Sequence, residues 1–380
     1  MADTAPSLKL TFEGAMKILQ AAIAKATAIG VPQCIAIVDT GGHLLAFARM
    51  DGAFVQSIDS SLAKAMTAAS YSAPTGHLEA GMDLKLAIVT SGKRSRPSAR
   101  PSASIERTML ESKRAAIAGY DVHYWSGGAG FPILMLHGVG PGTSILANYQ
   151  PVLEPLSRHC TIIAPDLIGF GKSARKAAPP FFDVPLWVEQ GLAMLELLPP
   201  GPCGIIGHSL GGALALMIAS RSSRVTKVLT SSTVGAPYTL PVALDEFWAV
   251  PPDADALACA MRRMVYDPAA VGAEMVADRW ALFQSPGYAE YFGAMFAAPR
   301  QRYLDAGVLG DAELARIGAR VVMLHGRDDQ PCPAEATTLP LARLLPSADV
   351  HLFGACGHNL PRERMADYLA AATALFADRA

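Results

Sequence analysis

The chain has 380 residues, of which 51% are hydrophobic and 17% charged, so it carries enough apolar material for a large folded core, and general disorder is excluded. At about 100–200 residues per domain, this length predicts two domains, or one large domain with an appendage. The formal net charge of −1 provides no overall field that would attract nucleic acid or an anionic membrane. We therefore expect a small molecule as the partner.

The six cysteines are scattered, without a C-x-x-C pair or a Cys/His spacing typical of a zinc site, so we expect reduced thiols and no metal or other cofactor. The first residues lack the apolar stretch of a secretory signal. No run of about 18 apolar residues that could cross a membrane is found. These features predict a cytoplasmic protein with neither a membrane nor a nucleic acid as its partner.

The first predicted element is an amphipathic helix. Apolar residues recur at helical spacing over residues 16–26, after the N-cap candidate Thr11, and Gly30 ends the run. A β-hairpin with glycines at its turn and a second helix are expected to follow, at residues 34–38, 43–49 and about 57–72.

This order of elements resembles the GlcG/HbpS family of small α/β domains over about residues 7–76. The resemblance rests on two glycine-containing turns, Val38-Asp39-Thr40-Gly41-Gly42-His43-Leu44 and Arg49-Met50-Asp51-Gly52-Ala53. Some members bind haem or cobalamin-related ligands and oligomerise, which makes His43, His77 and Met50 candidate ligands and a haem-linked sensor or assembly protein an alternative function. Because the further strands of the family are missing, we expect a partial domain with a scaffolding or homo-oligomerising role.

A basic linker is predicted at residues 91–108, where Ser, Pro and Ala alternate with five basic residues and one acidic residue. No aromatic residues are interleaved with these charges, which favours a solvated spacer over a nucleic-acid tether. The linker divides the chain into a small domain at 1–90 and a large domain at 109–380.

In the large domain, short apolar runs alternate with helical stretches, which predicts an α/β fold with a mostly parallel sheet and helices on both faces. Functional groups in such sheets lie at the carboxyl ends of the strands. The predicted strands are residues 133–136, 161–164, 204–206, 225–229, 321–324 and 350–353.

The third of these strands ends in Gly207-His208-Ser209-Leu210-Gly211-Gly212, and a helical stretch follows. This sequence fits the G-x-S-x-G nucleophile elbow, in which small neighbours allow a strained turn to present the serine at a helix N-terminus. Ser209 is therefore the predicted nucleophile.

A serine hydroxyl needs a general base, and the base needs an acid that orients it. The chain order in this architecture is serine, acid, histidine. Asp329 follows the strand at 321–324 and His358 follows the strand at 350–353, so we expect His358 as the base and Asp329 as the acid, with Asp328 as the fallback.

An oxyanion hole requires backbone N–H groups directed at the developing negative charge. The first strand ends in His137-Gly138-Val139-Gly140-Pro141-Gly142, a turn that can present such a donor. We predict the N–H groups of Val139 and Leu210 as the oxyanion hole, and we expect Gly138, Gly140 and His208 to line the substrate pocket.

From these motifs, residues of about 110–380 are identified as a member of the α/β-hydrolase superfamily. The 137–142 turn and the loops at 166–173 and 326–333 resemble those of the meta-cleavage product hydrolases, which split carbon–carbon bonds in vinylogous diketo acids from aromatic catabolism. The resemblance implies a helical cap at about 235–305, with Arg279 binding the substrate carboxylate and the adjacent Trp280 also at the substrate.

Two positions differ from that family, which commonly has Asn before the nucleophile and Trp after the catalytic histidine. Here these positions hold His208 and Asn359. The leading prediction is a serine-type hydrolase that cleaves a carbon–carbon bond with water as second substrate, and the alternative is a carboxylesterase or amide hydrolase acting on a small acyl compound.

Overall fold

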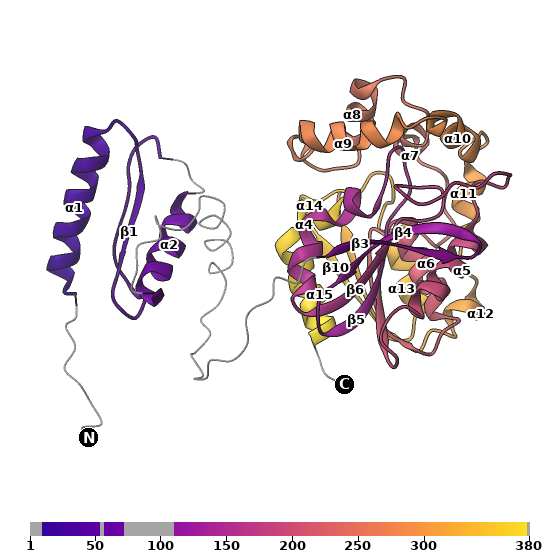
Figure 1. Ribbon diagram of the computed structural model, residues 1–380, viewed down its shortest axis with the longest axis horizontal. Helices are drawn as coiled ribbons and strands as arrows, with labels where there is room; N and C mark the ends of the chain where they lie inside the picture. Colours follow the sequence, from indigo (N-terminus) through magenta and orange to yellow (C-terminus); the bar gives the residue numbers. More distant parts are fainter. Residues whose placement is uncertain (1–9, 54–56, 72–109, 378–380) are drawn as a thin grey trace. The chain divides into compact units, whose positions relative to one another are not determined.

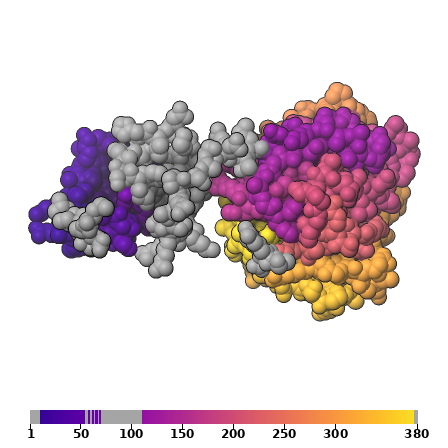
Figure 2. Space-filling model, turned by 60° about the horizontal axis from the view of Figure 1, so that its bottom comes forward, coloured from indigo at the N-terminus to yellow at the C-terminus, as the bar shows by residue number. Residues whose placement is uncertain are grey.

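The computed structural model describes residues 10–53, 57–71 and 110–377. The chain divides into two compact units, Met1–Ser104 and Ile105–Ala380, which are indigo and magenta to yellow, respectively, in Figures 1 and 2. The predicted linker at 91–108 and the candidate ligand His77 lie outside the described residues. Among the helices that the structure describes, none is long and apolar enough to cross a membrane.

The N-terminal unit is a helix, a hairpin and a second helix, as predicted. Helix α1 (Phe12–Ala28) begins where the Thr11 hydroxyl accepts a hydrogen bond from the N–H of Gly14 at 3.1 Å. Strands β1 (Cys34–Val38) and β2 (Leu44–Arg49) pair antiparallel, and α2 (Ser57–Tyr71) follows.

The hairpin turn is built on Asp39. Its Oδ1 accepts hydrogen bonds from the N–H groups of Gly41 and His43 at 2.9 and 2.8 Å, and it lies 3.0 Å from Nδ1 of the His43 ring. These contacts give His43 a structural role in the turn between β1 and β2.

The C-terminal unit is built on an eight-stranded sheet with the strand order β10-β9-β8-β7-β5-β6-β4-β3. The six predicted strands are all present, and they are parallel to one another. They are β5 (Phe131–Leu136), β6 (Cys160–Pro165), β7 (Cys203–His208), β8 (Val225–Ser231), β9 (Arg320–Gly326) and β10 (Ala348–Phe353).

Two strands at one end of the sheet were not predicted. They are β3 (Glu111–Ile117) and β4 (Tyr120–Gly127), which form an antiparallel hairpin, and β4 pairs antiparallel with β6. Strand β3 begins with four exposed residues, Glu111 to Arg114, so it lacks the continuous apolar run by which the central strands were recognised. Charged side chains of this kind are usual on an edge strand because they oppose pairing with other chains.

Helices cover both faces of the sheet, as Figure 1 shows. Alternate residues of β5 belong to different core clusters, with Ile133 and Met135 on one face and Leu134 and Leu136 on the other. The first face is covered by α4 (Ile145–Ser157), α14 (Leu360–Glu363) and α15 (Met365–Ala377), and the second by α5 (Val184–Leu195), α6 (Leu210–Ala219), α12 (Asp311–Leu314) and α13 (Thr338–Leu344).

Most of the chain between β8 and β9, from α7 to α11, forms a helical cap over the carboxyl ends of the strands (Figure 1). Most of its aromatic side chains pack against one another; for example, the ring centroids of Phe292 and Phe296 lie 4.8 Å apart. The cap elements are α7 (Val242–Phe247), α8 (Ala254–Arg262), η2 (Pro268–Ala270), α9 (Ala273–Phe283), α10 (Tyr288–Met295) and α11 (Gln301–Asp305).

Candidate active site

Ser209 occupies a strained turn between β7 and α6. Its backbone has φ 55° and ψ −122°, a conformation that is unfavourable for a residue with a Cβ atom and that is retained at functional sites. Ser209 is the N-cap residue of α6, yet its side chain makes no capping hydrogen bond. The hydroxyl is therefore available to the pocket above the sheet.

The neighbouring glycines make this turn possible. A Cβ atom at Gly207 would lie 2.2 Å from the carbonyl oxygen of Gly211, and one at Gly211 would lie 2.4 Å from that of Leu136. Both contacts are with backbone atoms, which cannot move aside easily. The spacing of the motif is thus explained by the close approach of β7, α6 and the end of β5.

Asp329 and His358 meet at the carboxyl ends of β9 and β10. Oδ2 of Asp329 is 2.8 Å from Nδ1 of His358, and its Oδ1 accepts a hydrogen bond from the N–H of Cys332 at 2.9 Å. The neighbouring Asp328 instead lies near Arg327, at 3.6 Å. Of the two acids considered from the sequence, Asp329 is the one that faces the imidazole.

Electrostatics couple this pair. Burial alone would raise the pKa of Asp329, but the positive charge on His358 and hydrogen bonds from His325 and His358 hold that pKa well below its usual value. Burial would lower the pKa of His358, but the Asp329 carboxylate raises it well above the usual value. The pair thus stabilises an imidazolium, which is the species formed when a histidine takes a proton from a serine.

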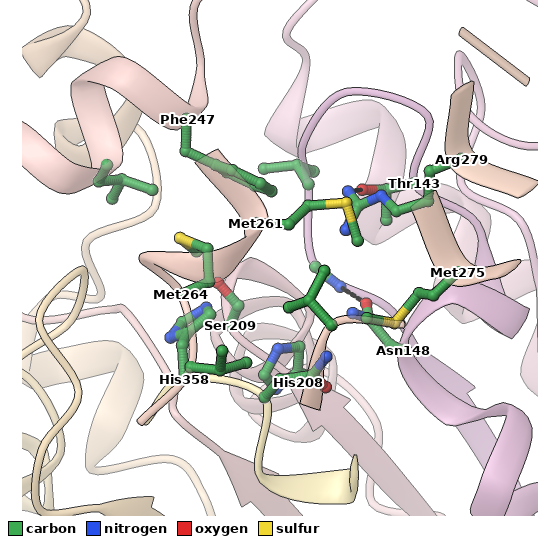
Figure 3. Close-up of a pocket in the computed structure, with 16 residues that line it drawn as sticks. Thr143, Asn148, His208, Ser209, Phe247, Met261, Met264, Met275, Arg279 and His358 are labelled. Carbon is green, nitrogen blue, oxygen red and sulfur yellow. Dashed lines mark hydrogen bonds between the residues drawn. The ribbon is translucent and has the colours of Figure 1, made fainter. Parts of the chain in front are cut away.

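Ser209 and His358 line the same pocket, which holds only about 40 Å³ of space (Figure 3). Gly138, Val139 and His208 also line it. The other side chains are mainly apolar and include three flexible methionines from the cap, Met261, Met264 and Met275.

The turn after β5 is fixed by buried hydrogen bonds. The N–H of Gly138 donates to Oδ1 of Asn148 at 2.9 Å, and Nδ1 of His137 lies 2.6 Å from the carbonyl oxygen of Gly138. Within the described residues, the N–H groups of Val139 and Leu210 donate to no acceptor. Both remain available for a ligand in the pocket.

Gly140 is not among the residues that line this pocket, and its predicted contact with the substrate stays a prediction. A Cβ atom at Gly140 would lie 2.3 Å from the ring of Phe247 and 3.3 Å from Nη2 of Arg279. Gly140 thus leaves room for the two cap side chains that face the turn.

Arg279 is buried, with 8% of its surface exposed, and it lines the pocket. Its Nε donates to the carbonyl oxygen of Pro141 at 3.1 Å, its Nη2 donates to the hydroxyl of Thr143, and the guanidinium lies over the ring of Phe247. Burial lowers its pKa to about 10, which still leaves it positively charged at neutral pH. No carboxylate among the described residues forms an ion pair with it.

Trp280 is not among the residues that line this pocket, and its predicted contact with the substrate stays a prediction. On α9, Met275 and Arg279 are four positions apart and share the face that lines the pocket. Trp280 is one position further round the helix, and its ring stacks on that of Phe283 with centroids 5.6 Å apart.

His208 is buried beside the other groups of the site. Its Nδ1 is 3.1 Å from the hydroxyl of Ser231, and its ring centroid is 4.9 Å from that of His358. Burial and the charge on His358 lower the pKa of His208 well below its usual value, so this ring is neutral.

Several pocket residues had no recognisable motif in the sequence. Asn148 carried a weak signal, because it is a polar residue on the buried face of α4, whereas Thr143 and the three methionines carried none. Their place in the site depends on how the cap and α4 pack against the sheet.

Comparison with known families identifies the fold. The model of the alpha/beta hydrolase family matches residues 133–372, more than half of the chain. The chain belongs to the alpha/beta hydrolase family. A second model, described as a haem degrading protein HbpS-like family, matches residues 10–134.

The HbpS-like match is longer than the 7–76 range that the sequence motifs predicted. It reaches across β3 and β4 into β5, but these strands belong to the sheet of the hydrolase unit. In the structure, β4 pairs with β6, which fixes the hairpin in that sheet.

The curated relatives of this hydrolase include meta-cleavage enzymes. The 2-hydroxy-6-oxo-2,4-heptadienoate hydrolase of Pseudomonas putida is 36% identical over 241 residues, which are 63% of this chain and 87% of the relative. The 2-hydroxymuconate semialdehyde hydrolase of Pseudomonas sp. strain CF600 is 34% identical over 242 residues, 63% of this chain and 85% of the relative.

The solved structures that are similar to this chain include hydrolases of the same kind. The meta-cleavage product hydrolase CumD from Pseudomonas fluorescens IP01 is 29% identical, with a TM-score of 0.67 over 70% of this chain and 98% of that one. The 2-hydroxy-6-oxo-6-phenylhexa-2,4-dienoate hydrolase from Rhodococcus sp. strain RHA1 is 26% identical, with a TM-score of 0.64 over 71% of this chain and 100% of that one.

Proposed function

We propose that the hydrolase unit cleaves a carbon–carbon bond in a 2-hydroxy-6-oxo-dienoate, with water as the second substrate. Relatives that the chain covers over most of their length are named as hydrolases of 2-hydroxy-6-oxo-2,4-heptadienoate and of 2-hydroxymuconate semialdehyde. The observation that carries the proposal is Arg279, a buried cation that faces the pocket and forms no ion pair with a described carboxylate. A substrate carboxylate would supply the missing counter-charge.

In this proposal, Ser209 is the nucleophile or the group that activates water, His358 is the base and then the acid, and Asp329 orients His358. Attack on the 6-oxo carbon converts its carbonyl oxygen to an oxyanion, and the proton of the attacking hydroxyl passes to His358. Before this attack, the 2-hydroxyl loses its proton and carbon 5 gains one, which gives the 2,6-diketo form of the substrate. When the bond between carbons 5 and 6 then breaks, its electron pair moves into the 2-oxo group. The carbon chain that bears the carboxylate leaves as a dienoate, and the acyl fragment leaves as a carboxylic acid after hydrolysis.

The oxyanion would be bound by the N–H groups of Val139 and Leu210, which have no acceptor in the described structure. Each donor of such a pair contributes about 3–4 kcal/mol when judged by its removal. Gly138 supports this geometry, because a Cβ atom there would lie 2.9 Å from Cβ of Ser209.

A carboxylated substrate distinguishes this proposal from the esterase or amidase alternative. A guanidinium has five N–H groups, and Arg279 uses one for Pro141 and one for Thr143, so three remain for a ligand. An uncharged ester would leave that buried charge without a partner, whereas a dienoate carboxylate would pair with it.

The test is direct turnover. The full-length protein is mixed with 2-hydroxy-6-oxo-hepta-2,4-dienoate, and loss of dienoate absorbance is compared with release of nitrophenol from a neutral ester. We expect turnover of the dienoate that disappears in Ser209→Ala. Ester turnover without any dienoate turnover would assign the protein to the esterase alternative.

We also propose that the chain acts in the cytoplasm and forms a homo-oligomer. None of the six cysteines forms a disulfide, and five of them are buried, in keeping with a reducing compartment. Light scattering of the purified protein tests the oligomer, and its mass should be a multiple of 39.9 kDa.

The haem-linked alternative for the N-terminal unit is tested by the haem absorbance band, and a protein that stays colourless after incubation with haemin would exclude it.

A further inference from the structure

Cys332 lies next to the two residues proposed as base and acid. The ligand atoms of Asp329, Cys332 and His358 all lie within 4.8 Å of one another, and all three residues are buried. Because Cys332 is three residues after Asp329 while His358 comes from the next strand, no spacing in the sequence revealed this cluster. A thiol, an imidazole and a carboxylate are together the ligand types that Zn²⁺ and related thiophilic ions prefer.

We propose that Asp329, Cys332 and His358 form a binding site for a thiophilic divalent cation, Zn²⁺ or Cd²⁺, and that occupation of this site switches the hydrolase off. Bonds of about 2.0–2.3 Å from one ion require ligand atoms about 3.3–3.8 Å apart. The separations of up to 4.8 Å in the structure are thus closed by small movements of side chains.

The inhibition follows from which ring nitrogen is used. Nδ1 of His358 is the nitrogen that lies 2.8 Å from Asp329, so it is the one within reach of the ion. When the ion takes Nδ1, the ring proton moves to Nε2, and the Cys332 thiol releases its proton to solvent as it coordinates. Nε2 then carries a hydrogen and cannot accept a proton from Ser209.

The residues around the Cys332 thiol favour binding of a metal ion at this position. The hydroxyl of Tyr238 lies 3.4 Å from Sγ of Cys332 and can donate a hydrogen bond to the coordinated sulfur. Nε2 of His325 lies 2.7 Å from the carbonyl oxygen of Cys332, which holds the Asp329–Cys332 loop against β9. Of the three ligand residues, only His358 lines the pocket, so an ion that enters the pocket meets His358 first.

The experiment uses the full-length protein with Cys259→Ser, because Cys259 is exposed and would bind metal by itself. The protein is freed of metal with a chelator, exchanged into metal-free buffer and titrated with Cd²⁺ or Zn²⁺. Binding is followed by the ultraviolet absorption of the cadmium–thiolate bond, and inhibition is followed by the rate on whichever substrate the protein turns over. The absorption does not depend on activity, so it tests the site even if the proposed carbon–carbon chemistry fails.

The deciding variant is Cys332→Ala, which retains the backbone N–H that donates to Asp329. It should remain active, lose the thiolate absorption and raise the half-inhibiting metal concentration by at least about tenfold. Cys160→Ala, which removes a different buried thiol, should behave like the parent, and a chelator should restore the parent's activity. If Cys332→Ala does not fold, Cys332→Ser gives the same expectation because a hydroxyl is a poor ligand for these ions.

Two results would overturn the proposal. One is the absence of thiolate absorption in the Cys259→Ser parent at saturating Cd²⁺. The other is inhibition of Cys332→Ala at the same metal concentration as the parent, which would place the inhibitory ion elsewhere.

Discussion

Replacement of Arg279 by Lys separates a carboxylate-binding role from a structural one. The guanidinium is fixed by Pro141, Thr143 and the face of Phe247, and its remaining N–H groups are free for a substrate carboxylate. Lys keeps the positive charge but loses the planar fork that binds a carboxylate through two hydrogen bonds. The expected loss is one hydrogen bond to a charged group.

Such a bond contributes about 1.5–3 kcal/mol, and about 1.4 kcal/mol corresponds to a tenfold change in rate. We therefore expect Arg279→Lys to lower kcat/KM for the dienoate by at least about tenfold. The change for a neutral nitrophenyl ester should be small. Both rates are measured on one preparation of each protein, with thermal unfolding as the check that the variant is folded.

Thr143→Val is the matched control, because Arg279 also holds the loop that carries Val139. This variant removes the hydroxyl that accepts a hydrogen bond from Arg279 but retains the positive charge. It should affect both substrates to a similar extent. If Arg279→Lys lowers the two rates equally, Arg279 acts through the loop, and the assignment of a carboxylate site is wrong.

The remaining predictions concern Ser209 and three aspartates. Ser209→Ala should lower turnover by several orders of magnitude without a change in unfolding, and near-normal rates in this variant would exclude Ser209 as the nucleophile. Asp329→Asn should lower kcat by up to about 10⁴, while Asp328→Asn does much less; the reverse order in steady-state assays would transfer the role to Asp328. Asp166→Asn should destabilise the hydrolase unit by about 3 kcal/mol in urea, because this buried carboxylate accepts hydrogen bonds from two backbone N–H groups and lies 2.9 Å from His123. Burial opposes the ionisation of Asp166, but those contacts hold its pKa below the usual value. The difference in unfolding free energy between the parent and Asp166→Asn should therefore shrink as the pH falls through that pKa. A difference that is the same at every pH would show that the contacts contribute nothing.

The strained turn at Ser209 and the central strands followed from the sequence because local rules govern them. The turn at Ser209 needs small residues at fixed positions, because a Cβ atom at Gly207 or Gly211 would clash with backbone atoms. The proximity of Asp329 and His358 also followed from the sequence, since both directly follow strands and the ends of parallel strands meet at one edge of the sheet.

Tertiary packing decided the rest of the site. The sequence placed Arg279 and Trp280 together, and only the rotation of α9 against the sheet turned Arg279 into the pocket and Trp280 onto Phe283. In the same way, Cys332 had no distinguishing pattern in the sequence, and only the pairing of β9 with β10 brought it beside His358. The physical reason is that strand order and helix rotation are set by the burial of whole faces, so side chains whose partners lie on other elements carry no local signal of their neighbours.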